Sequence, residues 1–236
     1  MSNFSETKLN EVASQSLYTT FTNSNTILYS FEIFSRFLRK GKVLELGPAE
    51  GLMTDLLLKY DDQLTVIDGS SIYAELLSKK FPSIKVVHAL FEEAIIEDRF
   101  DFIVLGHVLE HVADPIILLN TIKKWLAPGG KVLCAVPNAR SLHRQAAVEM
   151  RLIDSIFSQS AKDIHHGHMR IYTPETFKSD FYKAGYTIDI FGGYWLKPIS
   201  DKQIEASWDQ GMLSAFLKLG ESYPDIAAEI YIIASI

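Results

Sequence analysis

The chain has little cysteine, no long basic run and no long apolar run, and each scarcity disfavours a class of protein. Its one cysteine, Cys134, cannot form an internal disulfide, which fits a reducing cytoplasm. The formal net charge of -6 disfavours nucleic acid as the main partner. No apolar run approaches the roughly 20 residues of a membrane span, and residues 1–26 show no signal-peptide pattern. We therefore expect a cytoplasmic protein with no membrane or nucleic-acid partner.

The composition present is that of an ordinary globular protein. The 236 residues are 47% hydrophobic and 22% charged, which suffices for one α/β domain without staples. From Lys42 onward, short apolar segments alternate with helical patterns, which predicts a mostly parallel sheet with helices on both faces and ligands at the carboxyl ends of its strands. The predicted strands are 43–46, 64–68, 85–90, 101–105, 131–136, 186–191 and 229–235. The predicted helices are 27–38, 52–60, 72–81, 115–127, 141–154 and 174–184.

The chain divides by composition into an N-terminal part and a main domain. Residues 1–40 are expected to form an arm and a cap helix, and residues 41–236 the main domain. Within that domain, residues 139–175 interrupt the alternation and are interpreted as a substrate-side insert. The polar stretch 1–26 either frays or covers a bound ligand, and both possibilities stay open.

A turn of small residues follows the first predicted strand. Gly47, Ala49 and Gly51 allow a ligand to lie against the backbone, because no bulky Cβ stands in the way. The helix that follows offers free N–H groups for polar ligand atoms. Asp68 ends the second predicted strand, about 20 residues further on, where a carboxylate can accept the hydroxyls of a ribose.

This turn, preceded by Glu45 and followed by Asp68, resembles the cofactor site of class I S-adenosylmethionine-dependent methyltransferases. The resemblance implies S-adenosylmethionine as cofactor and a Rossmann-like sheet of seven strands with an antiparallel last strand. The competing dinucleotide fingerprint needs a third glycine where this chain has Leu52. The cofactor-binding residues implied by the resemblance are Glu45, Gly47, Ala49, Gly51, Asp68, Gly69, Phe91, Gly106 and His107.

Residues 167–173 read Gly-His-Met-Arg-Ile-Tyr-Thr and resemble a block of small-molecule and sugar methyltransferases. If this segment is extended, His168, Arg170 and Tyr172 lie on one side of it. A histidine has a suitable pKa for a general base, with His168 the first candidate. Arg170 suits an anionic acceptor, or forms with Tyr172 a hydrogen-bonded brace. The candidate catalytic residues are His168, His165, His166, Arg170 and Tyr172.

Further polar residues are expected near the same mouth. His143 and Arg144 follow a strand end, and Lys197 lies in a later loop, so all three are candidates for binding the substrate. The histidines at 165–168 also raise the question of a metal. Adjacent side chains of an extended segment point to opposite faces, so we expect no metal site there.

The resemblance implies methyl transfer to a small molecule, and we expect O-methylation of a sugar or secondary metabolite. N-methylation is the first alternative. A nicotinamide-dependent oxidoreductase and a non-catalytic cofactor-binding protein are two others. A monomer or a homodimer is expected.

Overall fold

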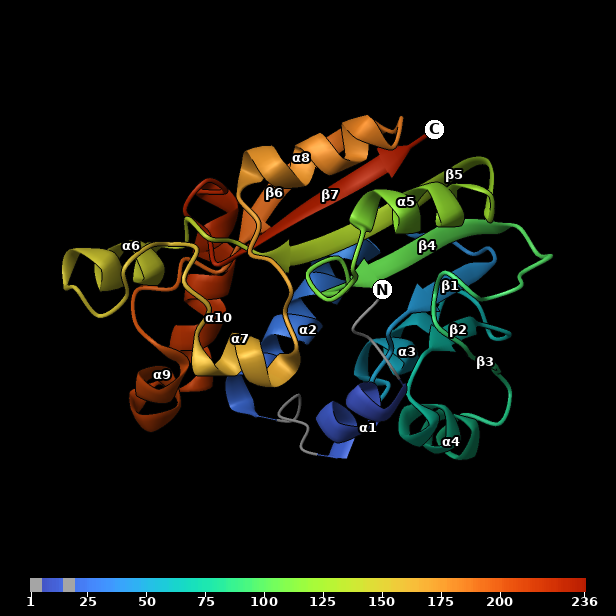
Figure 1. Cartoon of the computed structure of the whole chain (residues 1–236), viewed down its shortest axis with the longest axis horizontal. Coiled ribbons are helices and arrows are strands. Elements are labelled where there is room, and N and C mark those ends of the chain that lie inside the picture. The colour runs from blue at the N-terminus through green and yellow to red at the C-terminus, as the bar shows by residue number, and fades with distance from the viewer. Residues whose placement is uncertain (1–5, 15–19) are drawn as a thin grey trace.

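The computed structural model describes residues 6–14 and 20–236 and contains one seven-stranded sheet of order β3-β2-β1-β4-β5-β7-β6 (Figure 1). Neighbouring strands from β3 across to β5 are parallel, and β7 is antiparallel to both β5 and β6. The predicted Rossmann-like sheet with an antiparallel last strand is therefore confirmed. The strands are β1 Val43–Leu46, β2 Thr65–Asp68, β3 Lys85–His88, β4 Phe100–Gly106, β5 Leu126–Pro137, β6 Thr187–Tyr194 and β7 Glu229–Ser235.

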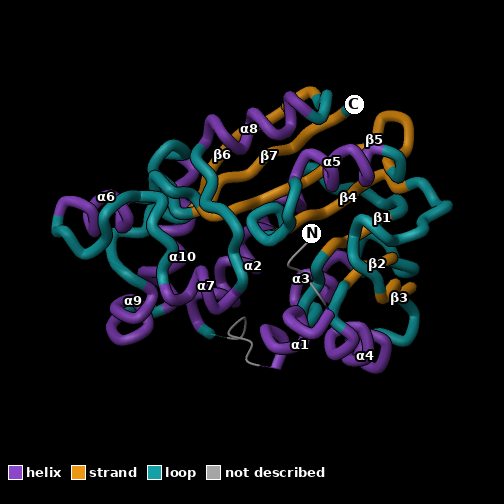
Figure 2. Tube along the Cα trace, viewed as in Figure 1, coloured by secondary structure: helices purple, strands orange, loops and turns teal. Residues whose placement is uncertain are grey.

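Helices cover both faces of this sheet (Figure 2). In the described part of the chain they are α1 Glu6–Ser14, α2 Phe21–Ser35, α3 Leu52–Leu57, α4 Ser71–Lys80, α5 Pro115–Lys123, α6 Leu142–Glu149, α7 Ala161–His166, α8 Pro174–Lys183, α9 Asp201–Ser207, α10 Gln210–Leu219 and the short 3₁₀ helix η1 Gly220–Ser222. None of the helices described is long and apolar enough to cross a membrane.

Alternation along the central strands divides the core into two layers. In β4, Ile103 and Leu105 pack with apolar residues of α5 and α8. Phe102 and Val104, which point the other way, pack with residues of α2, α3, α4 and α10. Figure 1 accordingly shows α5 and α8 in front of the sheet and α2 behind it. Cys134, in β5, is buried in the first layer, as a small core residue should be.

The predicted helix boundaries differ from the structure where capping and packing decide them. The helix expected at 27–38 begins at Phe21, because the side chain of Thr20 accepts a hydrogen bond from the N–H of Asn23 and caps it. The helix expected at 115–127 ends at Lys123, and residues 126–130 belong to β5. A register shift where β5 meets β4 lets the glycine-rich turn join the strand.

The histidine-rich link contains a helix that the sequence pattern did not predict. Ser160 and Asp163 form a capping box that starts α7, and Gly167, with φ of 76°, ends it. The assumption of an extended segment at 165–166 was therefore wrong. At the other end of the chain, α1 packs beside α4, and Asn10 donates a hydrogen bond to Ser71. Residues 1–5 and 15–19 of the expected arm lie outside the described residues.

Candidate functional site

Two cavities adjoin at the carboxyl ends of β1, β2 and β4. The larger has a volume of about 400 Å³ and the smaller about 140 Å³. Gly47, Ala49 and His107 line both, so the cavities meet where β1 and β4 end. The chain order reverses between these two strands, and open α/β sheets bind their ligands at such a point.

The turn after β1 has the backbone conformation that its small residues permit. Gly47 has φ of 64°, and a Cβ on it would lie 3.2 Å from Cγ2 of Val108. Ala49 also has a positive φ, of 48°. Gly51 lines neither cavity, and a Cβ on it would lie less than 3.0 Å from the side chains of Leu77 in α4 and of Phe81, the C-cap of that helix. Gly51 therefore allows α3 to pack on α4, and the structure places it at neither cavity.

Asp68 lies at the smaller cavity, as expected for a ribose-binding carboxylate. It is 7% exposed, and its Oδ1 accepts a hydrogen bond of 2.8 Å from the N–H of Ser70. Burial raises the pKa of Asp68 to about 6, against backbone hydrogen bonds from Ser70 and Ala49 that lower it. At neutral pH the side chain is a carboxylate with acceptor capacity left for two hydroxyl groups.

The rest of the smaller cavity is mostly apolar and suits an aromatic base. Gly69 and Phe91 line it, as expected, together with Leu90. Leu9 and Val12 of α1 close it from the opposite side, so the N-terminal helix covers this cavity. The smaller cavity thus has a carboxylate at one place, Asp68, and mostly apolar walls elsewhere.

Glu45 is buried beneath the larger cavity, which it lines. Its Oε2 accepts a hydrogen bond of 2.7 Å from Oγ1 of Thr54. Burial raises the pKa of Glu45 to about 8, although the bond from Thr54 lowers it. The group is thus mainly protonated at pH 7 in the absence of a cation near it.

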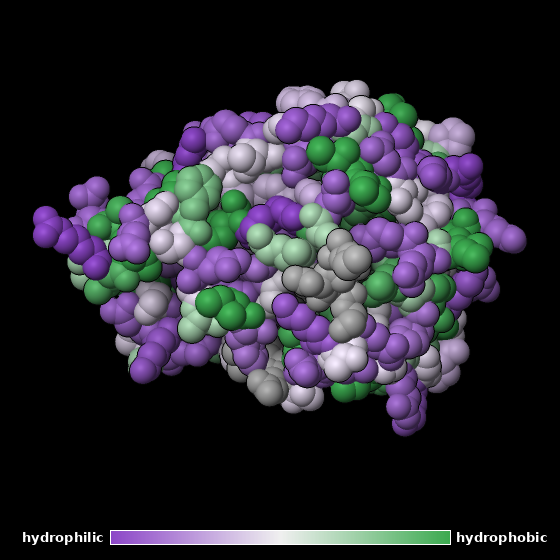
Figure 3. All heavy atoms as spheres, in the orientation of Figure 1, coloured by the Kyte–Doolittle hydropathy of each residue, from purple (hydrophilic) through white to green (hydrophobic). Residues whose placement is uncertain are grey.

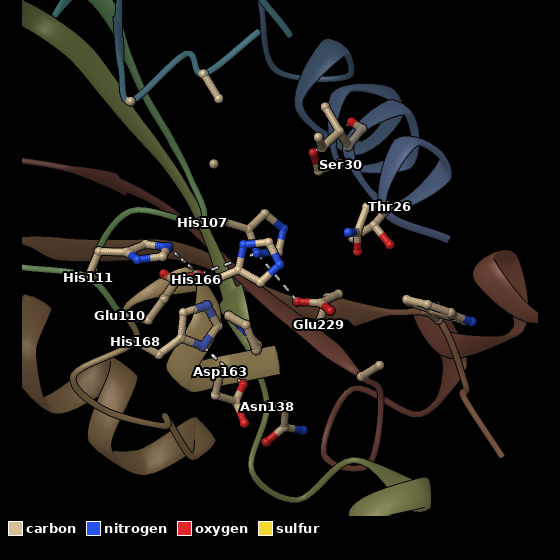
Figure 4. Close-up of a pocket in the computed structure, with 18 of the residues that line it drawn as sticks. Thr26, Ser30, His107, Glu110, His111, Asn138, Asp163, His166, His168 and Glu229 are labelled. Atoms are coloured by element: carbon tan, nitrogen blue, oxygen red, sulfur yellow. Dashed lines mark hydrogen bonds and ion pairs between the residues drawn. The ribbon is translucent and has the colours of Figure 1, made fainter. Parts of the chain in front are cut away.

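The wall of the larger cavity opposite α2 is rich in histidine (Figure 4). Three residues of this wall come from the loop after β4: His107, whose φ is 60°, Glu110 and His111. His166 and His168 come from α7 and the segment after it. Gly106 also lines this cavity, as expected for a residue that lets the ligand approach β4.

Electrostatic effects within this wall are large because the groups are buried. Burial lowers the pKa of His111 to about 4, so its imidazole is neutral at pH 7. Burial would raise the pKa of Glu110, but the imidazole of His107, 3.5 Å away, and the neighbouring rings lower it below its ordinary value. Nδ1 of His168 lies 3.1 Å from Oδ1 of Asp163.

Arg170 and Tyr172 form the brace that was one of the two expectations for them. The guanidinium of Arg170 donates hydrogen bonds to the carbonyls of Leu109, Val112 and Ala113. It lines the larger cavity, but its donors are directed to this loop and not to an anionic acceptor. Tyr172 lines neither cavity, and its hydroxyl donates to Asp180 over 3.0 Å.

The remaining predicted residues differ in whether they line a cavity. His165 lines neither cavity, whereas His166 lines both. His143, Arg144 and Lys197 all line the larger cavity. Nζ of Lys197 lies 2.5 Å from Oδ1 of Asp201, and Arg144 donates to two backbone carbonyls of residues 156–158, so both cations are held in place.

Several site residues were missed from the sequence. Thr26 and Ser30 of α2, Asn138 after β5, and Glu229 of β7 also line the larger cavity (Figure 4). Asp163 was missed although it lies five residues before His168, because its role depends on the unpredicted helix α7.

The face of the molecule shown in Figure 3 is mostly hydrophilic, with hydrophobic residues in separate patches.

Comparisons with known proteins agree with this geometry. A family model described as a methyltransferase domain matches residues 27–189. An uncharacterised protein of Methanocaldococcus jannaschii is 30% identical over 122 residues, which are 50% of this chain and 57% of that protein.

The solved structures that resemble this one share its fold at low sequence identity. A methyltransferase from Mesorhizobium loti has a TM-score of 0.65 at 16% identity, covering 87% of this chain and 97% of that one. The N-methyltransferase NodS from Bradyrhizobium japonicum, bound to S-adenosyl-L-homocysteine, has a TM-score of 0.61 at 14% identity, covering 97% and 96%. The fold and the site thus define a class I S-adenosylmethionine-dependent methyltransferase, as predicted. The chain belongs to the methyltransferase-domain family.

Proposed function

We propose that this protein transfers a methyl group from S-adenosylmethionine to a hydroxyl oxygen of a small polar molecule. The observation that carries the proposal is the pair of adjoining cavities. The smaller suits a nucleoside, and the larger has room and polar groups for an acceptor. Because both are lined by the turn after β1, the two substrates would meet beside Gly47 and His107.

Each side of this junction has a separate task. Asp68 would hold the ribose, and Gly47 would let the methionine part approach the backbone. Bound S-adenosylmethionine supplies an electrophilic methyl group, whose C–S electron pair stays on sulfur as the acceptor oxygen forms the new O–C bond. The protein's contribution is to align the acceptor oxygen and to remove its proton.

The proton would leave at the group formed by Glu110, His111 and His168. Asp163 accepts a hydrogen bond from Nδ1 of His168 and so fixes the ring orientation. Burial would raise the pKa of Asp163, but the hydrogen bonds from His168 and Ser160 hold it below its ordinary range, so it remains charged. An oriented histidine beside a fixed carboxylate suits the deprotonation of a hydroxyl group.

The chemistry of the larger cavity favours a polar acceptor. Lys197 is paired with Asp201, and Asn138 donates its amide hydrogens to the carbonyls of Asp225 and Ala227, so its walls hold rigid polar groups. Burial lowers the pKa of His143 to about 3, and the charge of Lys197 adds to this effect, so His143 is neutral and can donate or accept. A sugar hydroxyl is a suitable partner for such a wall.

N-methylation is the alternative that the fold leaves open, since similar structures include proteins named as N-methyltransferases. An amine acceptor that is protonated at neutral pH must also lose a proton before it can attack, so the Asp163–His168 pair would serve that reaction as well. Three other predictions stand unchanged. The acceptor is predicted to be a small molecule and not a nucleic acid, the protein to be a monomer or a homodimer, and its location to be the cytoplasm. One similar structure is a complex with an activator protein, Trm112 of Haloferax volcanii.

The test is methyl transfer from isotopically labelled S-adenosylmethionine to a panel of hydroxyl and amine acceptors, read by mass spectrometry. Calorimetry with S-adenosylmethionine and with a nicotinamide dinucleotide should show binding of the first alone. Products methylated only on nitrogen would replace O-methylation by N-methylation. Cofactor binding without turnover on any acceptor would favour the non-catalytic alternative.

A further inference from the structure

Three potential ligand side chains converge on the wall of the larger cavity. One ligand atom each from Glu110, His111 and His168 lies within 4.8 Å of the other two. All three residues line the cavity, and Figure 4 shows the two imidazoles on either side of the carboxylate. Small rotations of the side chains would bring such atoms to the roughly 2.0–2.2 Å of metal–ligand bonds.

Glu110 supplies an independent observation. Its side chain is 1% exposed, yet among the described residues neither carboxylate oxygen has a partner in ordinary hydrogen-bond geometry. Nδ1 of His107 lies 3.5 Å from Oε1, and Nε2 of His111 lies 4.0 Å from it. Both oxygens of this buried carboxylate therefore keep unused acceptor capacity, which a bound cation can take up.

The ring of His168 is oriented as metal-binding histidines usually are. Its Nδ1 is engaged by Asp163, which leaves Nε2 as the nitrogen with a lone pair for a ligand bond. Asp163 is itself held by the N–H and hydroxyl of Ser160, each at 2.7 Å from Oδ2. A carboxylate behind a histidine fixes the tautomer and raises the basicity of the other nitrogen.

The two segments that carry these side chains are joined by direct hydrogen bonds. The N–H of Met169 donates to the carbonyl of Glu110 over 2.8 Å. Arg170 binds three carbonyls of the same loop, from Leu109 to Ala113. The rings of His111 and His168 therefore meet edge to face, with centroids 4.7 Å apart. The backbone bond of Met169 and the side chain of Arg170 thus hold the two segments that carry the ligands next to each other.

From this geometry we infer that Glu110, His111 and His168 bind a divalent transition-metal cation, of the class Mn²⁺, Fe²⁺, Co²⁺ or Zn²⁺. Two imidazoles and one carboxylate on one side of the ion suit these metals and leave positions open toward the cavity. An acceptor hydroxyl bound there would become more acidic and would be fixed in place. This role in catalysis rests on the proposed function and would replace proton removal by His168, because the lone pair of Nε2 cannot hold a cation and accept a proton at once. The binding of the cation does not rest on the proposed function. The inference departs from the expectation of no metal, because the ligands come from two segments far apart in the sequence.

The test is titration of chelator-treated full-length protein with Mn²⁺, followed by electron paramagnetic resonance, and with Zn²⁺, followed by calorimetry. The wild type should bind one equivalent of at least one of these ions. Glu110→Gln, His111→Ala and His168→Ala should each weaken binding by about 10-fold or more. His165→Ala is the matched control, because it removes a neighbouring imidazole that lies outside the cavities, and it should bind as the wild type does.

A variant that fails to fold is recognised by loss of cofactor binding, and Asp163→Asn then replaces it. This nearly isosteric change removes the charge behind His168 and should weaken metal binding by roughly 10- to 100-fold. Equal binding by the wild type and all the ligand variants, or no binding of either ion, would overturn the site. Because neither acceptor nor cofactor is present in the titration, a failure of methyl transfer does not affect it. Full-rate transfer by metal-free protein would overturn the catalytic role of the cation and leave the proposed function intact.

Discussion

The two adjoining cavities share a rim but are built in different ways. Around Asp68, most of the walls come from the segments that directly follow β1, β2, β3 and β4, and Leu9 and Val12 of α1 together with His166 complete them. Around Glu110, the wall joins the loop after β4 to the segment after α7, through Met169 and through Arg170, which is 57 residues from Ala113. The cofactor half of the site, around Asp68 and Gly47, therefore depends mainly on local backbone conformation. The acceptor half, around Glu110 and His168, depends on the docking of segments that are far apart in the sequence. We therefore expect the cofactor half to survive damage to the acceptor half.

The largest effect should come from His168→Ala. Whether the imidazole removes a proton or holds a cation, its loss should lower turnover by about 10²- to 10⁴-fold. The affinity for S-adenosylmethionine, measured by calorimetry, should stay nearly unchanged, because Asp68 and Gly47 lie on the other half. A parallel loss of cofactor affinity would show that the two halves are not independent.

Arg170→Ala should cause the next largest change, in stability as well as activity. Two of the carbonyls that it binds, those of Leu109 and Val112, are part-buried, and that of Ala113 is exposed to water. Since a buried group left without its partner costs about 1–3 kcal/mol, we expect a loss of about 2 kcal/mol or more in the free energy of unfolding. Urea unfolding measures it. The matched control is Arg140→Ala, whose exposed pair with Glu175 should be worth less than about 1 kcal/mol. Equal losses of stability in the two variants would show that the hydrogen bonds from Arg170 to the loop after β4 do not stabilise the fold.

Asp68→Ala addresses the cofactor half alone. Loss of a charged hydrogen-bonding partner typically costs about 1.5–3 kcal/mol, or roughly 10- to 150-fold in affinity. Calorimetry should show this weakening for S-adenosylmethionine, while metal binding at Glu110 stays as in the wild type. If the cofactor binds the variant normally, the ribose is held elsewhere.

The smallest effect is the pH dependence of stability due to Glu45. Burial raises its pKa from 4.5 to about 8, so the folded protein binds this proton more tightly than the unfolded chain does. Its contribution to stability is full below about pH 4.5 and is lost as the pH rises through 8. Asp68 acts in the same direction but below about pH 6. Between pH 6.5 and 8, Glu45→Gln should therefore remove a decline of at most about 1.4 kcal/mol per pH unit, seen in urea unfolding of the cofactor-free protein. An unchanged slope would show that Glu45 is ionised when buried.

The same contrast explains what the sequence could predict. The central strands and Asp68 follow from local patterns of apolar and small residues, and the structure has them where expected. The role of Arg170 as a clamp depends on which carbonyls lie nearby in the folded chain, and no local pattern states that. Asp163 was missed for the same reason, and Gly51 was assigned to the ligand because its packing against α4 is a tertiary contact.

The bond from the Met169 amide to the Glu110 carbonyl also bears on how the protein opens. If residues 160–170 detach as one cooperative unit, the ligands of the acceptor half disperse while the sheet stays closed. Hydrogen exchange at this amide would then be faster than in the central strands and would slow when a cation or acceptor binds. Such an enzyme would control its activity through the docking of a single segment, with the cofactor already in place.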